Sequence, residues 1–540
     1  MRPFRFGKKK KASESELTLP HVAETETELE NPKLSSSLAD NQTTLQTIFT
    51  NCPDFLYREL KIGQERMPVL LLYMNGLTDE QTVNEDILKS LVNIKSSNII
   101  VSGSNTIEII KNIFLEIGNI TEITTIGEVQ DAVLTGSVVL LLEGTSKALK
   151  IGTKGFDGRI VSEPATEGVV RGPREGFTES LQKNTAMLRR KIKTPNLKLE
   201  KFVLGRVTKT EVNIAYLDGT VNPKVVDEVK KRLSLIDVDS VLESAYIEEM
   251  IEDEPFSVFP QIDHSEKPDK IAAAIVQGQV AIFTDGTPFV LIVPTMMTQF
   301  LQSSEDYYER SIYATSIRLV RFVFLTLALL LPALYIAITT FHRGLLPTPL
   351  LISITAAREG APFPTVIEVL TMEVTFEALR EAGLRLPKPV GQAVSIVGGL
   401  VIGEAAVQAS MVSPVTVIIV ALTGIASFGI PSYSFALAIR ILRFGMITLA
   451  STLGLYGVLL GVLVMSAHLV SLRSFGVPYL APFAPFNLKD MKDSLIRLPW
   501  WAMGERPRLI AKNNNNRQRQ KFFLKPVPPD DNEKKGVNDA

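Results

Sequence analysis

The stretch LVRFVFLTLALLLPALYIAITTF, residues 319–341, decides the fold class of this chain of 540 residues. As an α-helix it is long enough to cross a hydrocarbon layer about 30 Å thick. Arg321 near its start can extend its guanidinium to the bilayer interface, and Pro332 should kink the helix, which membrane helices tolerate. The stretch therefore predicts a membrane protein.

Further apolar segments follow the first span and predict a multi-pass helical domain. The candidate spans are residues 391–412, 414–431 and 445–470. The Ser413-Pro414 step predicts a tight helical hairpin. Residues 345–357 are apolar but short, and residues 362–382 are too charged to face lipid throughout. For these two segments the sequence leaves both a crossing and an interfacial position open.

Basic residues flank the predicted membrane domain at both ends. Arg310 and Arg318 precede the first span, and Lys489, Lys492 and Arg497 follow the last one. Cytoplasmic flanks of membrane domains carry an excess of lysine and arginine. We therefore predict that the N-terminal region and the C-terminal tail both lie on the cytoplasmic side.

The residues before the first span have the pattern of a soluble α/β region in two parts. In the first part, the apolar runs Met67–Met74 and Ser137–Leu142 indicate buried strands. In the second part, alternation over residues 212–216 indicates a half-buried strand, and Asp285-Gly286 lies between two β-rich arms, which is typical of a hairpin.

These patterns divide the chain into five segments. The fold class is an α/β soluble region of two subdomains followed by an α-helical multi-pass membrane domain. The predicted segments are a disordered polar tail (1–44), soluble subdomains (45–158 and 159–312), the membrane domain (313–471) and a largely disordered cytoplasmic tail (472–540).

Composition argues against several classes of function. The formal net charge of -1 gives no electrostatic case for nucleic-acid binding. Cys52 is the single cysteine, and the four histidines lack metal-ligand spacing, so we expect no metal site and no cofactor. No nucleophile elbow, phosphate loop or acid–base constellation is found, so we do not expect an enzyme.

The second candidate span carries a polar stripe. Val397, Val401, Glu404 and Gln408 share one helix face, and the opposite face holds the small residues Gly399, Gly403, Ala406 and Ser410. A carboxylate at the bilayer centre costs at least about 2.5–3.5 kcal/mol, so Glu404 should face water or a bundle interior. The polar face is a candidate pore lining with a packing face behind it, and hydrogen bonding between helices is the alternative.

Two further sets of residues are candidates for a role in the membrane domain. The charged segment 362–382 carries the carboxylates of Glu368, Glu373, Glu377 and Glu381. In a ring of subunits these carboxylates would attract cations. A solvated face on a surface helix is an equal alternative. In the last span one face carries glycines suited to close helix packing, namely Gly454, Gly457 and Gly461.

Six stretches together carry a resemblance to a known family. In the soluble part they are SEPATEGVVRGPREGFTESLQKNTAMLRRKI (162–192), FPQIDHSEKPDK (259–270) and SEDYYERSI (304–312). In the membrane part they are PTPLLISITAAREGAPFP (347–364), MEVTFEALREAGLRLPKPVGQAVSIVGGLVIGEAAVQASMVSP (372–414) and SFGVPYLAPFAPF (474–486). These stretches resemble the A subunits of GerA-family spore germinant receptors. Lys267 and Glu404 depart from the family's pattern, which more often has an arginine and an amide at these positions.

The resemblance implies a receptor subunit in the inner membrane of a bacterial spore. It implies partners, namely a transporter-like B subunit that holds the nutrient site and a lipoprotein C subunit. It also implies that copies of the A subunit form a homo-oligomer that conducts ions in response to nutrient. A secondary transporter and a non-conducting membrane scaffold are the alternatives, and the absence of a clear repeat counts against the transporter.

Overall fold

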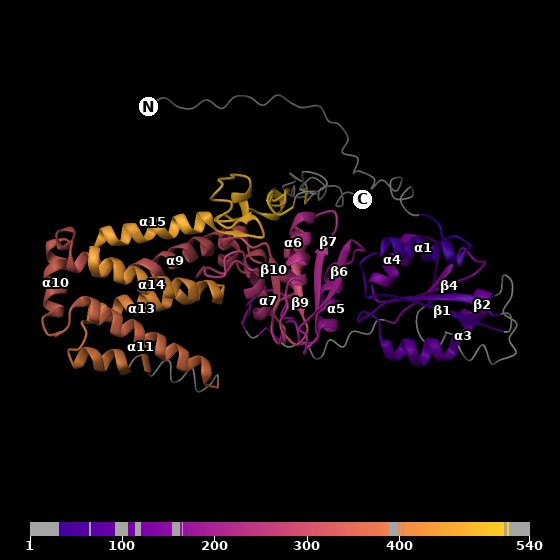
Figure 1. The fold of residues 1–540 in the computed structure, drawn as a ribbon, viewed down its shortest axis with the longest axis horizontal. Helices are drawn as coiled ribbons and strands as arrows, with labels where there is room; N and C mark the ends of the chain where they lie inside the picture. Colours follow the sequence, from indigo (N-terminus) through magenta and orange to yellow (C-terminus); the bar gives the residue numbers. More distant parts are fainter. Residues whose placement is uncertain are drawn as a thin grey trace, which may run out of the picture. The chain divides into compact units, whose positions relative to one another are not determined.

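Figure 1 shows the computed structural model, which describes residues 32–63, 66–91, 106–113, 120–153, 163–164, 166–387, 398–399, 401–511 and 516–517. The chain divides into two compact units. The first contains residues up to 50 and residues 54–156, and the second contains residues 51–53 and everything from residue 157 onwards.

The first unit is built on an antiparallel sheet of order β1-β2-β4-β5-β3. Its strands are β1 (Phe55–Ile62), β2 (Met67–Met74), β3 (Ile120–Ile123), β4 (Val138–Leu142) and β5 (Ala148–Ile151). All five residues of β4 are buried. The two strands expected from apolar runs are confirmed as β2 and β4, which pair directly. The helices that accompany the sheet are α1 (Leu38–Ile48), α3 (Thr106–Ile113), α4 (Ile126–Leu134) and a π-helical turn (Thr82–Leu88).

Helix α1 begins inside the range expected to be a disordered tail. Leu38 and Leu45 are buried, and the Leu38 amide donates a hydrogen bond to Glu143, which follows β4. Ser37 caps the helix N-terminus through its side chain. A few apolar residues in a polar stretch were enough to attach this helix to the sheet. Residues 1–31 lie outside the described residues.

The soluble part of the second unit repeats the same kind of sheet, in the order β6-β7-β9-β10-β8. Its strands are β6 (Leu197–Leu204), β7 (Thr210–Leu217), β8 (Asp263–Ser265), β9 (Val280–Thr284) and β10 (Val290–Val293). The hairpin expected at Asp285-Gly286 is confirmed between β9 and β10, with Gly286 at φ 89°. One face of the sheet packs on α6 (Pro223–Ser234) and α7 (Ser244–Ile251), and the other packs on α5 (Leu181–Lys191) and α8 (Pro268–Gln277).

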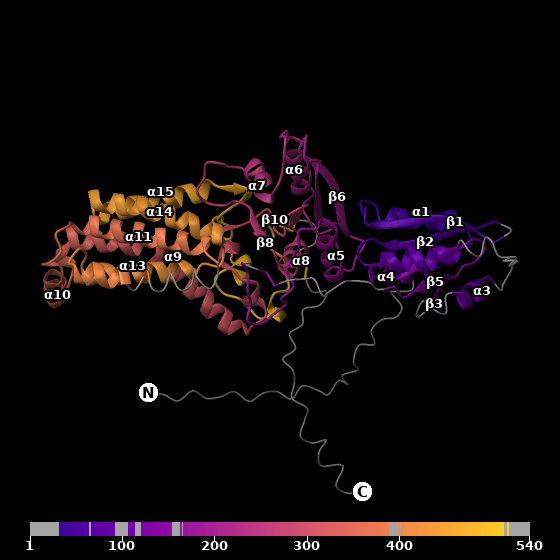
Figure 2. The ribbon, with the colours of Figure 1, turned by 90° about the horizontal axis from the view of Figure 1, so that it is seen from below.

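The rest of the second unit is a bundle of helices (Figure 2). They are α9 (Ser311–Thr340), α10 (Thr348–Arg358), α11 (Thr365–Arg385), α13 (Pro414–Phe428), α14 (Tyr433–Leu453) and α15 (Leu455–Ser471). By length and composition, α9 and α14 qualify as membrane spans, whereas α13 and α15 are shorter apolar helices. Ser413 caps the start of α13, with Pro414 in its first turn, as the expected hairpin requires.

The predicted span 445–470 is wrong, because it joins parts of two helices. The chain turns at Gly454, whose φ of 63° is open to glycine without strain, and α14 reaches back to Tyr433. The sequence pattern obscured the start of α14 because Arg440 and Arg443 interrupt its apolar character. Both arginines are buried in the bundle.

The chain after α15 folds back instead of leaving the structure as a tail. Its β11 (Arg473–Ser474) and β12 (Val477–Pro478) form a small hairpin. The Ser474 hydroxyl accepts a hydrogen bond from the Thr295 amide at 3.0 Å and donates one to the Gln261 carbonyl at 2.8 Å. Tyr479 is fully buried. The apolar and aromatic content of residues 474–486 supplies the buried surface that a disordered tail lacks.

Helices α14 and α15 meet through two of the predicted packing glycines. Gly457 and Gly461 are buried on α15, and a Cβ atom added at Gly461 would lie 2.5 Å from the Met446 sulfur. A Cβ atom added at Gly457 would collide with the backbone carbonyl of Leu449. Gly454 has another role, since it forms the turn between the two helices.

We predict that Gly457→Ala destabilises the protein, although alanine normally favours a helix over glycine by about 1 kcal/mol. The backbone of α14 cannot yield as a side chain can, so the two helices must separate. The midpoint for loss of monodisperse protein, measured by size exclusion after heating in detergent, should fall by several degrees. Gly445→Ala on α14 is the control, because its added methyl meets nothing within 4 Å. Equal behaviour of the two variants would contradict the packing described.

Candidate functional site

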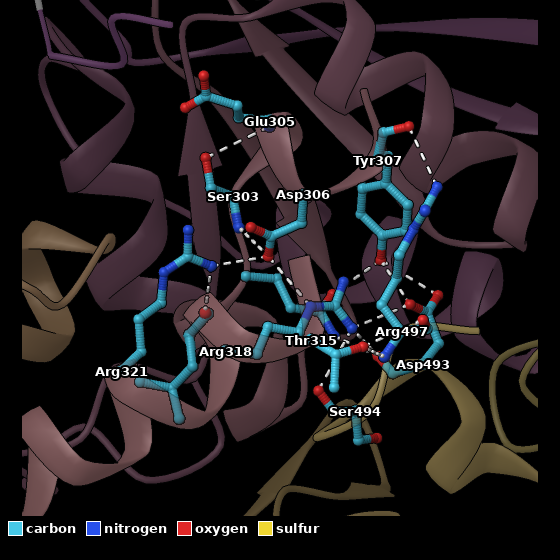
Figure 3. A network of polar contacts seen from close by, with 12 residues as sticks. Ser303, Glu305, Asp306, Tyr307, Thr315, Arg318, Arg321, Asp493, Ser494 and Arg497 are labelled. Carbon is cyan, nitrogen blue, oxygen red and sulfur yellow. Dashed lines mark hydrogen bonds and ion pairs between the residues drawn. The ribbon is translucent and has the colours of Figure 1, made fainter. Parts of the chain in front are cut away.

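A network of polar side chains joins the connection before α9, the first turns of α9 and the C-terminal segment (Figure 3). At its centre lies Asp306, which is 4% exposed and belongs to a capped 3-10 turn, Ser304–Tyr307. Its Oδ2 accepts hydrogen bonds from Arg318 Nε at 3.1 Å and from Arg321 Nη1 at 2.7 Å. Charge-assisted bonds of this kind are the stronger ones in proteins. One carboxylate therefore anchors two arginines of α9.

Arg318 extends the network to the C-terminal segment. Its Nη1 donates to the Asp493 carboxylate at 3.1 Å and to the Asp493 carbonyl at 2.9 Å. The guanidinium also lies 5.3 Å from the centroid of the Tyr307 ring. Burial raises the pKa of the Tyr307 hydroxyl well above its ordinary value, and the Asp493 carboxylate raises it further. Tyr307 therefore stays a neutral hydrogen-bond donor to Asp493.

Arg497 closes the network from the side of the C-terminal segment. Its amide donates to Thr315 Oγ1 at 3.1 Å, and its guanidinium donates to the carbonyls of Glu309 and Tyr307 at 3.3 and 3.2 Å. These bonds join residues more than 180 positions apart in the sequence. We call Asp306, Tyr307, Arg318, Arg321, Asp493 and Arg497 the junction network.

Sequence reasoning missed the junction network. Arg321, expected to extend to the bilayer interface, has its guanidinium held by Asp306 and the Leu301 carbonyl, which both precede α9. Two arginines three residues apart at the start of an apolar helix were a usable signal, since buried cations require partners. The position of Asp493 could not be anticipated, because nothing local in the sequence places it beside α9.

The charged segment 362–382 forms helix α11, and its carboxylates mostly face the interior of the bundle. Glu368 is 1% exposed and accepts hydrogen bonds from the Ser413 amide at 2.9 Å and from Thr416 Oγ1 at 3.0 Å. Arg358 of α10 supplies its counter-charge at 3.3 Å. This carboxylate thus ties α10 and α11 to the start of α13.

A second group of charges links α11 to α14. Arg443 is fully buried, and its Nη2 lies 3.0 Å from both Glu373 and Glu377. Arg440 and Arg380 each approach Glu377 at 3.4 Å. We call these five residues the arginine cluster. Because each charge has an opposite charge beside it, α11 can lie among apolar helices despite its composition.

The fourth carboxylate of the charged segment lies outside this group. Glu381 is exposed and pairs with Arg385 at 2.5 Å, one helical turn away. A pair of this type on a helix surface contributes a few tenths of a kcal/mol. Of the residues proposed as a carboxylate ring, only Glu381 lies on an exposed helix surface.

The candidate pore face is exposed where the structure describes it. Val401, Glu404 and Gln408 are all exposed, and Gln408 Nε2 donates to Glu404 Oε1 at 3.0 Å. No arginine or lysine among the described residues forms an ion pair with Glu404. Val397 lies outside the described residues.

The face of small residues, opposite the candidate pore face on the same helix, is only partly packed. Gly403 is buried, and a Cβ atom added there would contact Val417 of α13 at 3.6 Å. Ala406 is half-buried, whereas a Cβ atom added at Gly399 would meet open space. Ser410 of the same face approaches Gly360, where an added Cβ atom would lie 3.5 Å from the Ser410 hydroxyl.

A cavity of about 310 Å³ adjoins the junction network. It is lined by residues of α8 and of the connection to α9, together with Trp500. Amide and hydroxyl groups alternate with aromatic rings in its wall. In the described part of the chain, no group of three or more histidine, cysteine or acidic residues is placed to hold a metal ion.

Comparison with known proteins gives one family for most of the chain. Residues 43–509 match the family described as Bacillus/Clostridium GerA spore germination protein. The chain is 47% identical over 487 residues to spore germination protein KA of Bacillus subtilis (strain 168), covering 90% of this chain and 89% of that protein. It is 45% identical over 474 residues to the membrane protein YfkQ of the same organism, covering 88% and 91%.

One solved structure is similar to the soluble part. The crystal structure of the N-terminal domain of the A subunit of the Bacillus megaterium spore germinant receptor GerK3 shares 34% identity, with a TM-score of 0.40. The match covers 49% of this chain and 98% of that domain. The family match and the nearly full-length relatives, taken with the helical bundle, identify this membrane protein as a non-enzymatic A subunit of the GerA family of spore germinant receptors.

Proposed function

We propose that this A subunit oligomerises and forms a nutrient-gated cation channel with a transporter-like B subunit and a lipoprotein C subunit. The proposal rests on one contrast inside the helical bundle. Glu368, Glu373 and Glu377 each have an arginine partner at 3.0–3.3 Å, whereas among the described residues the side chain of Glu404 bonds only to that of Gln408. A carboxylate without a cation beside it is the group that can offer negative potential to passing cations.

The surroundings of Glu404 support a position at the interface between subunits. The helix that carries it touches its own chain through Gly403 and leaves the opposite face, with Val401 and Gln408, uncovered. An exposed carboxylate in contact with lipid is costly, so neighbouring copies or water must cover this face. A ring of copies around an aqueous path meets both requirements.

The path of the chain supports a multi-pass topology with both ends on one side. A Cβ atom added at Gly454 would lie 2.9 Å from His342, so the end of α9 and the start of α15 lie together. At the other end of the bundle, His468 of α15 bonds to Ser257 of the soluble part at 2.9 Å, and Arg497 bonds to Thr315. The basic flanks favour the cytoplasmic side for this end.

Helix α11 is proposed to cross the membrane with its neighbours. Its 21 residues correspond to about 31 Å of helix, which matches the hydrocarbon thickness. The arginine cluster neutralises the charges in its middle. The proposed crossings are then α9, α11, the segment around Glu404, α13, α14 and α15. Their total is an even number, as two ends on the same side require.

The junction network is proposed to transmit the nutrient signal to the bundle. It fixes the first turns of α9 to the preceding connection, through Asp306, and to the C-terminal segment, through Arg497. A change in the soluble part or in a partner subunit would therefore move α9 as a rigid element. The alternatives, a secondary transporter and a non-conducting scaffold, are separated from the channel by the experiments below.

We predict that Glu404→Gln lowers cation flux several-fold while expression and assembly stay intact, because it removes the charge and retains size and hydrogen bonding. Glu404→Lys should lower it further. Potassium flux is measured in vesicles containing the A, B and C subunits, and potassium release is measured in spores after nutrient addition. Glu381→Gln is the control, since its carboxylate pairs with Arg385 on the surface. If both Glu404 variants conduct as the parent does, the residue serves only in packing between helices.

We predict that Asp306→Asn destabilises the subunit by about 3–5 kcal/mol, since Arg321 then loses its buried counter-charge and Arg318 retains only Asp493. The thermal midpoint in detergent should fall by many degrees. Glu309→Gln is the control, because its ion pair with Arg171 is long, at 3.9 Å, and largely solvated.

A milder change separates coupling from folding. Arg497→Lys keeps the charge but cannot bond two carbonyls through a fixed fork. Germination in response to nutrient should slow several-fold at an unchanged receptor level, determined by immunoblot. A normal rate of germination for this variant would show that the junction network holds the fold and takes no part in signalling.

A further inference from the structure

The C-terminal segment displays large apolar side chains in a position where a soluble protein would bury them. Phe486, Leu488, Ile496, Trp500 and Trp501 are between 52% and 73% exposed. Within the same segment, Met503 and Ile510 are buried, so the segment has a defined inner side. Several large apolar side chains exposed within one short segment indicate a surface that another phase or molecule covers.

The junction network places this surface at the end of the first span. Arg497 bonds to Thr315, and the apolar run of α9 starts at Leu319, about 6 Å further along the helix. In the first turn of α9, Ile312 and Tyr313 are also exposed, at 83% and 58%. The exposed side chains therefore lie at the level where hydrocarbon gives way to headgroups. We call Ile312, Tyr313, Phe486, Leu488, Ile496, Trp500 and Trp501 the collar.

The charge around the collar is positive. Residues 486–508 contain five basic and three acidic side chains. Asp493 is neutralised by Arg318, and Glu505 lies 3.6 Å from Arg508. Lys489 and Lys492 are exposed, and neither forms an ion pair with the residues that the structure describes. Two free ammonium groups thus flank the apolar side chains.

We propose that the collar is a docking surface for anionic phospholipid headgroups in the leaflet next to the soluble part. Tryptophan and tyrosine prefer the headgroup level, where the ring is apolar on one side and wet on the other. Lysines near an anionic membrane surface attract it electrostatically. A protein partner fits less well, because the collar includes Ile312 and Tyr313 in the first turn of α9, just before the apolar run of this candidate span. The inference concerns lipid binding and stands apart from ion conduction.

The chain offers a direct probe, because Trp500 and Trp501 are its only tryptophans. Trp500 packs on the Tyr307 ring with centroids 5.8 Å apart, and Arg497 lies 5.8 Å from its ring. Trp500→Phe therefore retains an aromatic ring there and leaves Trp501 as the sole emitter. The full-length variant is placed in phosphatidylcholine vesicles that contain equal fractions of either brominated phosphatidylglycerol or brominated phosphatidylcholine, each with bromine near the headgroup.

The brominated anionic lipid should quench Trp501 at least twofold more strongly than the brominated neutral lipid. Adding Lys489→Gln and Lys492→Gln should bring this ratio close to one. Lys224→Gln with Lys231→Gln is the matched control, because these lysines are exposed on α6 of the soluble part, and it should leave the ratio unchanged. Bromine placed deep in the acyl chain should quench weakly.

Three results would overturn the proposal. Absence of bromine quenching with full access of acrylamide to Trp501 would show that the collar faces water. Absence of both kinds of quenching would show that protein, for example a second copy, covers it. Equal quenching by both brominated lipids, unaltered by the lysine substitutions, would show that headgroup charge plays no role.

Discussion

The helical bundle depends on the ion pair between Arg443 and two carboxylates of α11. An unpaired guanidinium between apolar helices would cost several kcal/mol, and the same holds for Glu373. Both side chains are fully buried and lie 3.0 Å apart. Their pairing allows α14 to be a span in spite of its arginines and allows α11 to lie beside it. Hydrophobic packing then closes the bundle around these paired charges.

The same physical rule acts at the end of the bundle near the soluble part. Asp306 neutralises the arginines of α9, and Asp493 brings the C-terminal segment to the same place. The connection that precedes α9, the first span and the C-terminal segment therefore meet in one network of buried charges.

Glu404 differs from the paired carboxylates of α11. The described part of the bundle supplies an arginine to each of the buried or half-buried carboxylates of α11 and none to this one. Its partner, Gln408, is neutral and comes from the same helix. The surface that this helix presents is therefore incomplete in a single chain, which is what an oligomeric channel would require of its subunit.

Patterns within a few residues of one another were enough to predict the two-part α/β region, the first span and the hairpin at Asp285-Gly286. Family motifs, which are also local, identified the receptor subunit. The sequence did not show where α14 begins, since the partners of Arg440 and Arg443 lie more than 60 residues away on α11.

The junction network and the fold of residues 474–502 were equally hidden in the sequence. Asp306, Arg318 and Asp493 are unremarkable charges when taken one by one, and only the tertiary structure brings them within hydrogen-bonding distance. Periodicity and turn chemistry act between neighbours in the chain, so the sequence determines elements and their apolar faces. The packing of distant segments decides which charged side chains form pairs, because a buried charge is tolerated only where that packing supplies its partner.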